Sequence, residues 1–355
     1  MSERVSEPVT EPASELRDPA TPTAERCVTS YPARRAYRPG VVHPPQAPGV
    51  QGMVDIHCHA HEGQQDALSL AKFASEAGMR AILYKTIGAI SGEYRPARGV
   101  AAVREGLARW SDETGIAPIE CLAGYGVTMD NRPPTLARLR QALDDGVAGV
   151  WLHVFNHALT LHKVGGKFIW WNKDADPAAH SAPLPWDEAL RHGHYLLDER
   201  GRLKPLVQDM LRMVFDADIA LFYGHGTHPE FEALTEFVDK AGFRRAVIDH
   251  PFSPFIDLSV AQMKQHAAAG VTLNFTFDEL SPLLGVDPAR MAEAVRAVGV
   301  EHVTLSSDAG EPLFPNTVEC MRLVSGYMAA FGLDAAAIDR TCRINPARIA
   351  GLPVS

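Results

Sequence analysis

Three apolar segments that each end in a residue able to bind a metal ion constrain this chain more than any other feature. They are 54–59 (VDIHCH), 246–250 (AVIDH) and 304–308 (TLSSD). Alternate residues of a strand share one face, so His57 and His59 can reach one metal while Cys58 points the other way. Several strands that each deliver a His or Asp at their C-terminal end are typical of a barrel enzyme with a metal at its mouth.

Composition narrows the class of protein. The chain has 355 residues, of which 46% are hydrophobic and 22% charged, as in soluble globular proteins. A net charge of -9 argues against nucleic-acid binding, and no apolar run approaches the ~18 residues that a membrane span needs. Five widely spaced cysteines without a CxxC motif, and a start without a secretory-signal pattern, predict a cytoplasmic protein.

The chain divides into an arm and a body. Residues 1–46 are rich in Glu, Pro, Ala, Thr and Arg and lack periodicity, which predicts a disordered or loosely attached N-terminal arm. Residues 47–355 form one predicted domain in which strands alternate with helices. The expected strands are 54–59, 81–86, 119–127, 149–155, 219–224, 246–250, 271–277 and 302–307.

Eight strands with helical connections predict an α/β protein with the (β/α)8 architecture of a TIM barrel. A doubly wound open sheet fits less well, because no glycine-rich phosphate loop follows the first strand. A long polar insertion, about residues 156–204, follows the fourth strand. Connections of that length usually serve as lids or binding elements, and the short 198–201 stretch indicates a turn, so part of the insertion is expected to be a hairpin.

The strand ends supply a set of candidate metal ligands and catalytic groups. Chemistry in such barrels lies at the C-terminal ends of the strands, where this chain has His57, His59, Lys85, His153, His225, His250 and Asp308. Four histidines and one aspartate in register at one edge predict a metal site. Imidazole and carboxylate ligands favour Zn, with Mn, Fe, Co or Ni as alternatives. Asp308 is expected to bind the metal and to carry a proton from water to the leaving group.

These residues resemble the pattern of the metal-dependent amidohydrolase superfamily over about residues 52–352. The superfamily has HxH after strand 1, His after strands 5 and 6, and Asp after strand 8, which here correspond to His57, His59, His225, His250 and Asp308. The sequence around 77–81, Lys85 and 224–225 is similar to an uncharacterised branch, a domain of unknown function. The resemblance implies a barrel hydrolase with one or two divalent metals.

One departure from that pattern concerns the bridge between two metals. Superfamily members with two metals usually bridge them with a carboxylated Lys or a Glu after strand 4, and strand 4 here offers neither. Either the site holds one metal, or Lys85 after strand 2 provides the bridge once carboxylated. Alternatively, Lys85 binds an anionic group of the substrate or pairs with an acid.

Further residues near the strand ends are candidates for substrate contacts. They are His61, His153, His157, His228 and Glu311. The leading hypothesis is a hydrolase that uses a metal-activated water to cleave an amide, lactam, lactone or ester bond of a small molecule. The alternatives are a metal-dependent non-oxidative decarboxylase of an aromatic carboxylate, a phosphoesterase, and a non-catalytic metal-binding barrel. The expected partner is a small-molecule substrate, without nucleic acid or membrane, and homo-oligomerisation stays open.

Overall fold

The computed structural model describes residues 48–61, 63–88, 94–129, 132–153, 156–165, 182–254, 256–311 and 313–354. The predicted arm over residues 1–46 lies outside the described residues, and so does the boundary that separates it from the body. None of its helices, over the described ranges, is long and apolar enough to cross a membrane.

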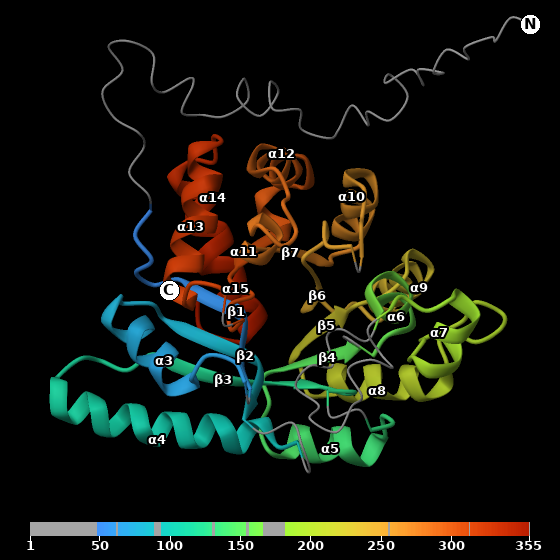
Figure 1. Ribbon diagram of the computed structural model, residues 1–355, viewed down its shortest axis with the longest axis horizontal. Coiled ribbons are helices and arrows are strands. Elements are labelled where there is room, and N and C mark those ends of the chain that lie inside the picture. The colour runs from blue at the N-terminus through green and yellow to red at the C-terminus, as the bar shows by residue number, and fades with distance from the viewer. Residues whose placement is uncertain are drawn as a thin grey trace, which may run out of the picture. The chain divides into compact units, whose positions relative to one another are not determined.

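Eight parallel strands follow one another in sequence order around a barrel (Figure 1). The strands are β1 (Val54–His61), β2 (Ala81–Gly88), β3 (Glu120–Gly126), β4 (Gly149–His153), β5 (Ala220–Gly224), β6 (Ala246–Asp249), β7 (Thr272–Thr276) and β8 (Val303–Ser306). Between β8 and β1 the barrel closes through a parallel bridge from Cys58 to Ala309, where the His59 amide donates to the Ala309 carbonyl at 2.7 Å. The predicted (β/α)8 barrel is confirmed.

Helices connect the strands and pack outside them. They are α3 (Ala67–Glu76), α4 (Pro96–Thr114), α5 (Leu136–Asp144), α6 (Ala158–Val164), α7 (Trp186–His192), α8 (Pro205–Asp216), α9 (His228–Lys240), α10 (Val260–Ala268), α11 (Phe277–Leu280), α12 (Pro288–Val298), α13 (Thr317–Ala330), α14 (Ala335–Asp339) and α15 (Asn345–Ala350), with a 3-10 turn η2 (Val300–His302) and a π-helical turn η3 (Arg340–Ile344).

Capping residues explain where these helices begin and end. The Asp287 side chain accepts a hydrogen bond from the Ala289 amide, Pro288 occupies the first turn of α12, and Gly299 ends that helix. In α5 the Thr135 hydroxyl accepts from the Arg138 amide in the same way. These contacts join residues close together in the chain, so the beginnings of α5 and α12 depend on local sequence.

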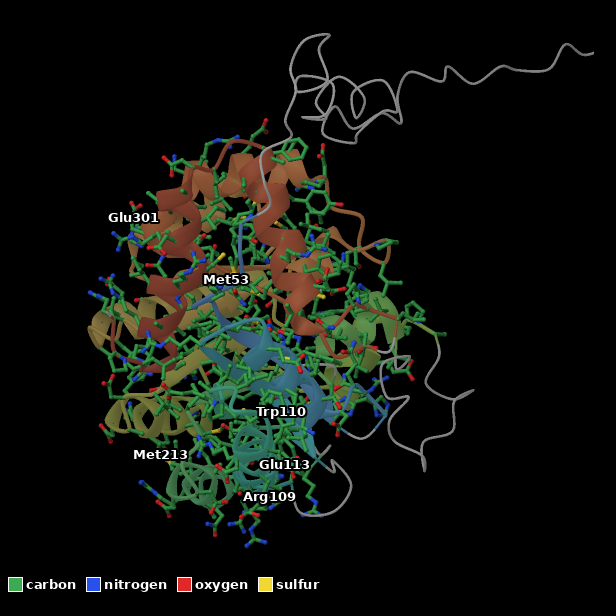
Figure 2. The ribbon with its side chains drawn as sticks, turned by 90° about the vertical axis from the view of Figure 1, so that its left-hand side faces the viewer. Met53, Arg109, Trp110, Glu113, Met213 and Glu301 are labelled. Carbon is green, nitrogen blue, oxygen red and sulfur yellow. The ribbon has the colours of Figure 1, made fainter. Side chains whose placement is uncertain are left out.

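Two apolar layers hold the body together. The barrel interior contains Ile56, Trp151, Phe222 and Val247, and the Trp151 and Phe222 rings stack with centroids 3.7 Å apart. A larger layer fills the space between the strands and the helices. Figure 2 labels three residues of α4: Arg109 and Glu113 are exposed, and Trp110 is partly buried against this layer. The interior layer forms the floor beneath the strand ends.

The insertion after β4 has more structure than the sequence predicted. Its described part contains the helices α6 and α7, which sequence analysis missed because each has only seven residues. The expected hairpin exists as a single antiparallel bridge between Leu197 and Leu203 around the turn at 198–201. His194 pairs with His157 through a second bridge, which ties the end of the insertion to its beginning.

Candidate metal centre

An irregularity in β1 aims two histidines into the barrel. Register with β2 shifts between Asp55 and Cys58, so Ile56 and His57 both face inward although they are neighbours. Asp55 faces outward and accepts hydrogen bonds from the Ser307 amide (3.0 Å) and the Thr317 hydroxyl (2.5 Å). A bulge of this kind re-aims side chains and is often found beside active sites. His57 and His59 consequently share the interior face, as predicted.

Three of the five predicted ligands form a tight cluster. The ligand atoms of His57, His59 and Asp308 lie within 4.8 Å of one another. Asp308 Oδ1 is 3.1 Å from His57 Nε2 and 3.0 Å from His59 Nε2. Both ring nitrogens of His57 are buried and lack a well-aligned hydrogen bond, although Asp249 Oδ1 lies 3.2 Å from Nδ1. A buried imidazole whose Nε2 faces a carboxylate without a hydrogen bond between them is part of a donor set that fits a divalent metal ion.

The remaining two predicted ligands lie beside this cluster. The ring centroid of His250 is 5.7 Å from that of His57, and the ring centroid of His225 is 5.3 Å from that of His250. All three rings are buried. The five residues therefore lie next to one another at the C-terminal edge of the strands, and His57, His59 and Asp308 are the most closely spaced of them.

Electrostatics leave the cluster in a state suited to metal binding. Burial lowers the pKa of His59 to about 3 and that of His250 to about 4, with only partial compensation from Asp308. Burial alone would raise the pKa of Asp308, but His57 and the hydrogen bond from His59 hold it well below its usual range. Neutral imidazoles and an ionised carboxylate are the protonation states in which these groups bind a metal.

A surrounding layer of polar side chains orients the histidine rings. The Thr86 hydroxyl lies 2.8 Å from His59 Nδ1, and Ser253 Oγ lies 3.0 Å from His250 Nδ1. Thr160, from the insertion, lies 2.9 Å from His225 Nδ1. Partners of this kind fix ring orientation and tautomer in metal sites, so the insertion takes part in shaping the centre.

Two predicted ligand residues have a positive φ, a backbone conformation that residues other than glycine rarely adopt. His250 has φ 31° and Asp308 has φ 51°. His250 directly follows β6, and Asp308 is the second residue after β8, where the chain turns toward the next helix. Left-handed conformations of non-glycine residues carry a cost and cluster at functional sites, which agrees with the assignment of this edge as the functional one.

Lys85, the predicted bridge or anion binder, lies on β2 and is buried. Burial lowers the pKa of its amine, and the charges of Asp308, Asp249 and Asp278 oppose that shift. Two of these acids, Asp308 and Asp249, are the carboxylates beside His57. The roles of Lys85 as bridge, anion binder or partner of an acid stay predictions.

Three predicted substrate contacts lie at the rim of the centre. His61 is the last residue of β1, and the side chain of Gln64 links it to Glu311. Gln64 Oε1 accepts a hydrogen bond from the backbone amide of His61 at 3.2 Å, and Gln64 Nε2 donates one to Glu311 Oε1 at 3.3 Å. His153 ends β4 and stacks on His194 with ring centroids 4.9 Å apart. Their substrate roles stay predictions.

Contacts favour a structural role for the other two predicted substrate residues. The Leu159 amide donates to His157 Nδ1 at 3.0 Å, and His157 Nε2 donates to the buried Glu230 at 2.9 Å. His228 is held between Gln262 (2.8 Å) and the Ile256 carbonyl (3.0 Å). These contacts occupy the ring nitrogens of both histidines within the scaffold.

Two acids at the centre were missed by sequence analysis. Asp249 accepts hydrogen bonds from the Trp151 indole (2.7 Å) and the Asn274 amide (2.8 Å), and lies 3.2 Å from His57 Nδ1. The sequence feature that could have indicated a role for Asp249 is an acid within the otherwise apolar segment 246–249. Asp278 follows β7, and burial together with Asp308 raises its pKa to about 8. Nothing in its sequence context distinguished Asp278 from an ordinary helix-start acid.

Solved structures with similar backbones show the same barrel fold. An amidohydrolase from Pseudomonas aeruginosa aligns with 87% of this chain and 98% of its own, at 11% identity and a TM-score of 0.55. The probable dipeptidase PvdM from the same organism aligns with 84% of this chain and 94% of its own, at 14% identity and a TM-score of 0.51. The chain shares the barrel fold of these two structures. The resemblance inferred from the ligand pattern is thereby confirmed at the level of the fold.

Two further comparisons add a third similar structure and a family match. N-acetyl-D-glucosamine-6-phosphate deacetylase from Mycobacterium smegmatis aligns with 86% of this chain and 77% of its own, at 16% identity and a TM-score of 0.50. Residues 141–274 match a family of unknown function, DUF6282, a segment that contains His225 and His250. No curated protein matches the sequence. The family match agrees with the predicted uncharacterised branch.

Proposed function

We propose that this chain is a metal-dependent hydrolase that cleaves an amide, lactam, lactone or ester bond of a small organic substrate. The observation that carries the proposal is the buried cluster of His57, His59 and Asp308 at the C-terminal edge of the barrel. Barrels of the same fold include proteins named as a deacetylase, an amidohydrolase and a dipeptidase, so hydrolysis is the reaction class to test first.

His57, His59 and Asp308 would hold the metal, with His225 and His250 completing its surroundings. A divalent metal in such a site acidifies water and polarises a carbonyl group, and ligands of this kind favour zinc. Asp308 is ionised, so its carboxylate accepts the proton of the attacking water as the new C–O bond forms. When the C–N or C–O bond of the substrate breaks, the same carboxylate passes that proton to the leaving nitrogen or oxygen.

Lys85 has two possible roles in this reaction. Burial lowers its pKa, and a neutral amine is the form that reacts with carbon dioxide to give a carboxylated lysine. Carboxylation would add an anionic oxygen ligand and allow a second metal. In its protonated form, Lys85 would instead bind an anionic group of the substrate.

Metal content separates these roles. The chain would be purified without chelator and analysed by elemental mass spectrometry as wild type, Lys85→Ala, and Lys264→Ala on the exposed side of α10. Two metals falling to one or none only in Lys85→Ala supports the bridge. One metal in all three chains assigns Lys85 to substrate binding. No metal in any of them, even after reconstitution, refutes the proposed hydrolase.

Activity of Asp308→Asn tests the reaction itself. Wild type, Asp308→Asn and the control Asp209→Asn, a surface residue of α8 paired with Arg212, would be assayed on panels of N-acyl compounds, lactams, lactones and esters. Loss of general acid–base catalysis predicts a rate lower by about 10²–10⁴-fold in Asp308→Asn alone. Carbon dioxide released from aromatic carboxylates, without hydrolysis of any panel member, would identify a decarboxylase instead.

A further inference from the structure

The last and first strands of the barrel meet at the candidate metal centre. The other neighbouring strands pair over runs of residues, whereas β8 and β1 join through an isolated bridge from Cys58 to Ala309. Figure 1 shows β1, in blue, beside the red elements that follow β8. His57 and His59 lie on the β1 side of this seam and Asp308 on the β8 side, so the seam sets the spacing of the three predicted ligands.

The first three residues after β8, which are Ser307, Asp308 and Ala309, form the ligand turn. Each of their backbone amides has an acceptor. The Ser307 amide donates to Asp55 Oδ1 at 3.0 Å, and the Asp308 amide donates to the His57 carbonyl at 2.8 Å. The Ala309 amide donates to Ser307 Oγ at 3.0 Å, while that hydroxyl donates to Asp55 Oδ2. Asp55 therefore holds the ligand turn both directly and through the Ser307 hydroxyl.

Asp55 also joins the ligand turn to two other elements. It is fully buried on β1 and accepts a hydrogen bond from the His57 amide at 3.2 Å. The Thr317 hydroxyl, at the start of α13, donates to Asp55 Oδ2 at 2.5 Å. A carboxylate offers about four acceptor positions, and donors from β1, the ligand turn and α13 occupy them. Buried networks that are satisfied in this way are rigid, so Asp55 is a fixed point between the two segments that carry His57 and Asp308.

The ligand turn has a backbone conformation that needs such support. Asp308 has φ 51°, in the left-handed region that residues other than glycine occupy at a cost and keep only where their surroundings hold them. Gly310, the next residue after the turn, has φ 134°, and a Cβ there would lie 2.3 Å from the His59 carbonyl oxygen. The chain therefore passes close around β1 at this point. Without its bonds to Asp55, the turn would be free to relax and to move Asp308 relative to the two histidines.

We propose that Asp55 is a positioning residue of the metal centre. Through Ser307 it holds Asp308 at the distance from His57 and His59 at which the three side chains bind one ion. Asp55 faces away from the barrel interior, so it acts through these residues and does not itself contact the ion. The inference rests on the metal site that the proposed function requires, and it adds to that function a residue whose loss weakens metal binding from outside the ligand set.

Zinc titration of the metal-depleted full chain, in competition with a chromophoric chelator, tests this proposal. Removal of groups that orient metal ligands typically lowers affinity by about 10–100-fold, and this range is expected for Asp55→Ala. Ser307→Ala removes one of the two links and should weaken zinc by about tenfold. Ser325→Ala is the matched control, because Ser325 is also fully buried and its hydroxyl donates to the Met321 carbonyl within α13. Its zinc affinity should stay within about twofold of wild type.

Two further readouts distinguish positioning from a general loss of stability. The visible absorption of bound cobalt(II) reports coordination geometry, so it should change in Asp55→Ala and Ser307→Ala at saturating cobalt but not in Ser325→Ala. Asp55→Asn keeps the shape of the side chain and an oxygen that accepts from the Ser307 amide, so it should bind zinc more tightly than Asp55→Ala. If Asp55→Asn is as weak as Asp55→Ala, the charge of Asp55 and not its contacts acts on the metal, and the positioning role is wrong.

The outcomes separate this proposal from the proposed function. Wild-type zinc affinity and an unchanged cobalt spectrum in Ser307→Ala and in Asp55→Ala would overturn the positioning role and leave the hydrolase standing. If Asp55→Ala does not fold, Ser307→Ala against Ser325→Ala decides the question alone. A wild-type chain that binds neither zinc nor cobalt would overturn the positioning role together with the metal-dependent hydrolase.

Discussion

Replacement of Asp249 should damage both the stability of the barrel and its affinity for metal. This carboxylate lies beneath the cluster and is fully buried. It accepts from the Trp151 indole at 2.7 Å and from the Asn274 amide at 2.8 Å, while one of its oxygens lies 3.2 Å from His57 Nδ1. Burial alone would raise the pKa of Asp249, but His57 beside it holds that pKa well below its usual range.

The magnitude follows from the groups left without partners. In Asp249→Ala the Trp151 and Asn274 donors lose a buried acceptor, and each unsatisfied donor costs about 1–3 kcal/mol. The free energy of unfolding should therefore fall by about 2–6 kcal/mol. Loss of the carboxylate that orients a metal-binding histidine typically lowers metal affinity by about 10–100-fold. Asp249→Asn retains an acceptor of similar shape and should lose less stability while showing a similar loss of affinity.

Urea denaturation of metal-depleted chains and titration with zinc measure the two effects separately. Asp209→Ala, which removes a surface aspartate from α8, serves as the control and should change neither quantity appreciably. A loss of stability below about 1 kcal/mol in Asp249→Ala would show that the indole and amide find other partners. Unchanged zinc affinity in both Asp249 variants would refute the assignment of His57 as a ligand supported by this acid.

Three further outcomes are expected. Gly224→Ala should lower the free energy of unfolding by clearly more than the ~1–2 kcal/mol that a left-handed backbone costs a residue with a side chain, because its Cβ would lie 1.8 Å from the His153 carbonyl oxygen. Gly201 has a similar φ and open space around it, so Gly201→Ala should cost only ~1–2 kcal/mol in urea denaturation. Burial lowers the pKa of His266 to about 4 in the folded chain, so below pH ~6.5 the unfolded chain binds a proton at His266 that the folded chain does not yet bind. The free energy of unfolding should therefore decline from pH ~6.5 toward pH 4. His266→Gln should reduce that decline by up to about 3 kcal/mol in denaturation curves measured at several pH values. Chelation should lower the melting temperature, since a ligand at 100 times its Kd stabilises by about 2.7 kcal/mol; an unchanged temperature after confirmed metal removal would contradict the fit of the cluster to a metal.

Local patterns in the sequence determined most of the architecture. Apolar runs followed by helical periodicity predicted all eight strands close to their observed positions, because alternation and capping depend on residues near one another in the chain. The HxH motif was interpretable for the same reason, since two residues of one strand decide which face they share. Short helices such as α6 and α7 escaped because seven residues carry too little periodicity.

Only the tertiary structure decided how the site is assembled. The pairing of β1 with β2 contains the bulge that brings His57 and Ile56 to the same face. The sequence of β1 alone does not predict that pairing. Asp249 becomes a partner of His57 across 192 positions of sequence, and His157 is occupied by Glu230 from another helix. Such pairings depend on closure of the barrel, which brings together the ends of strands that are distant in the chain. The sequence thus determined which ligand types stand at the strand ends, and the folded barrel determined which of them meet.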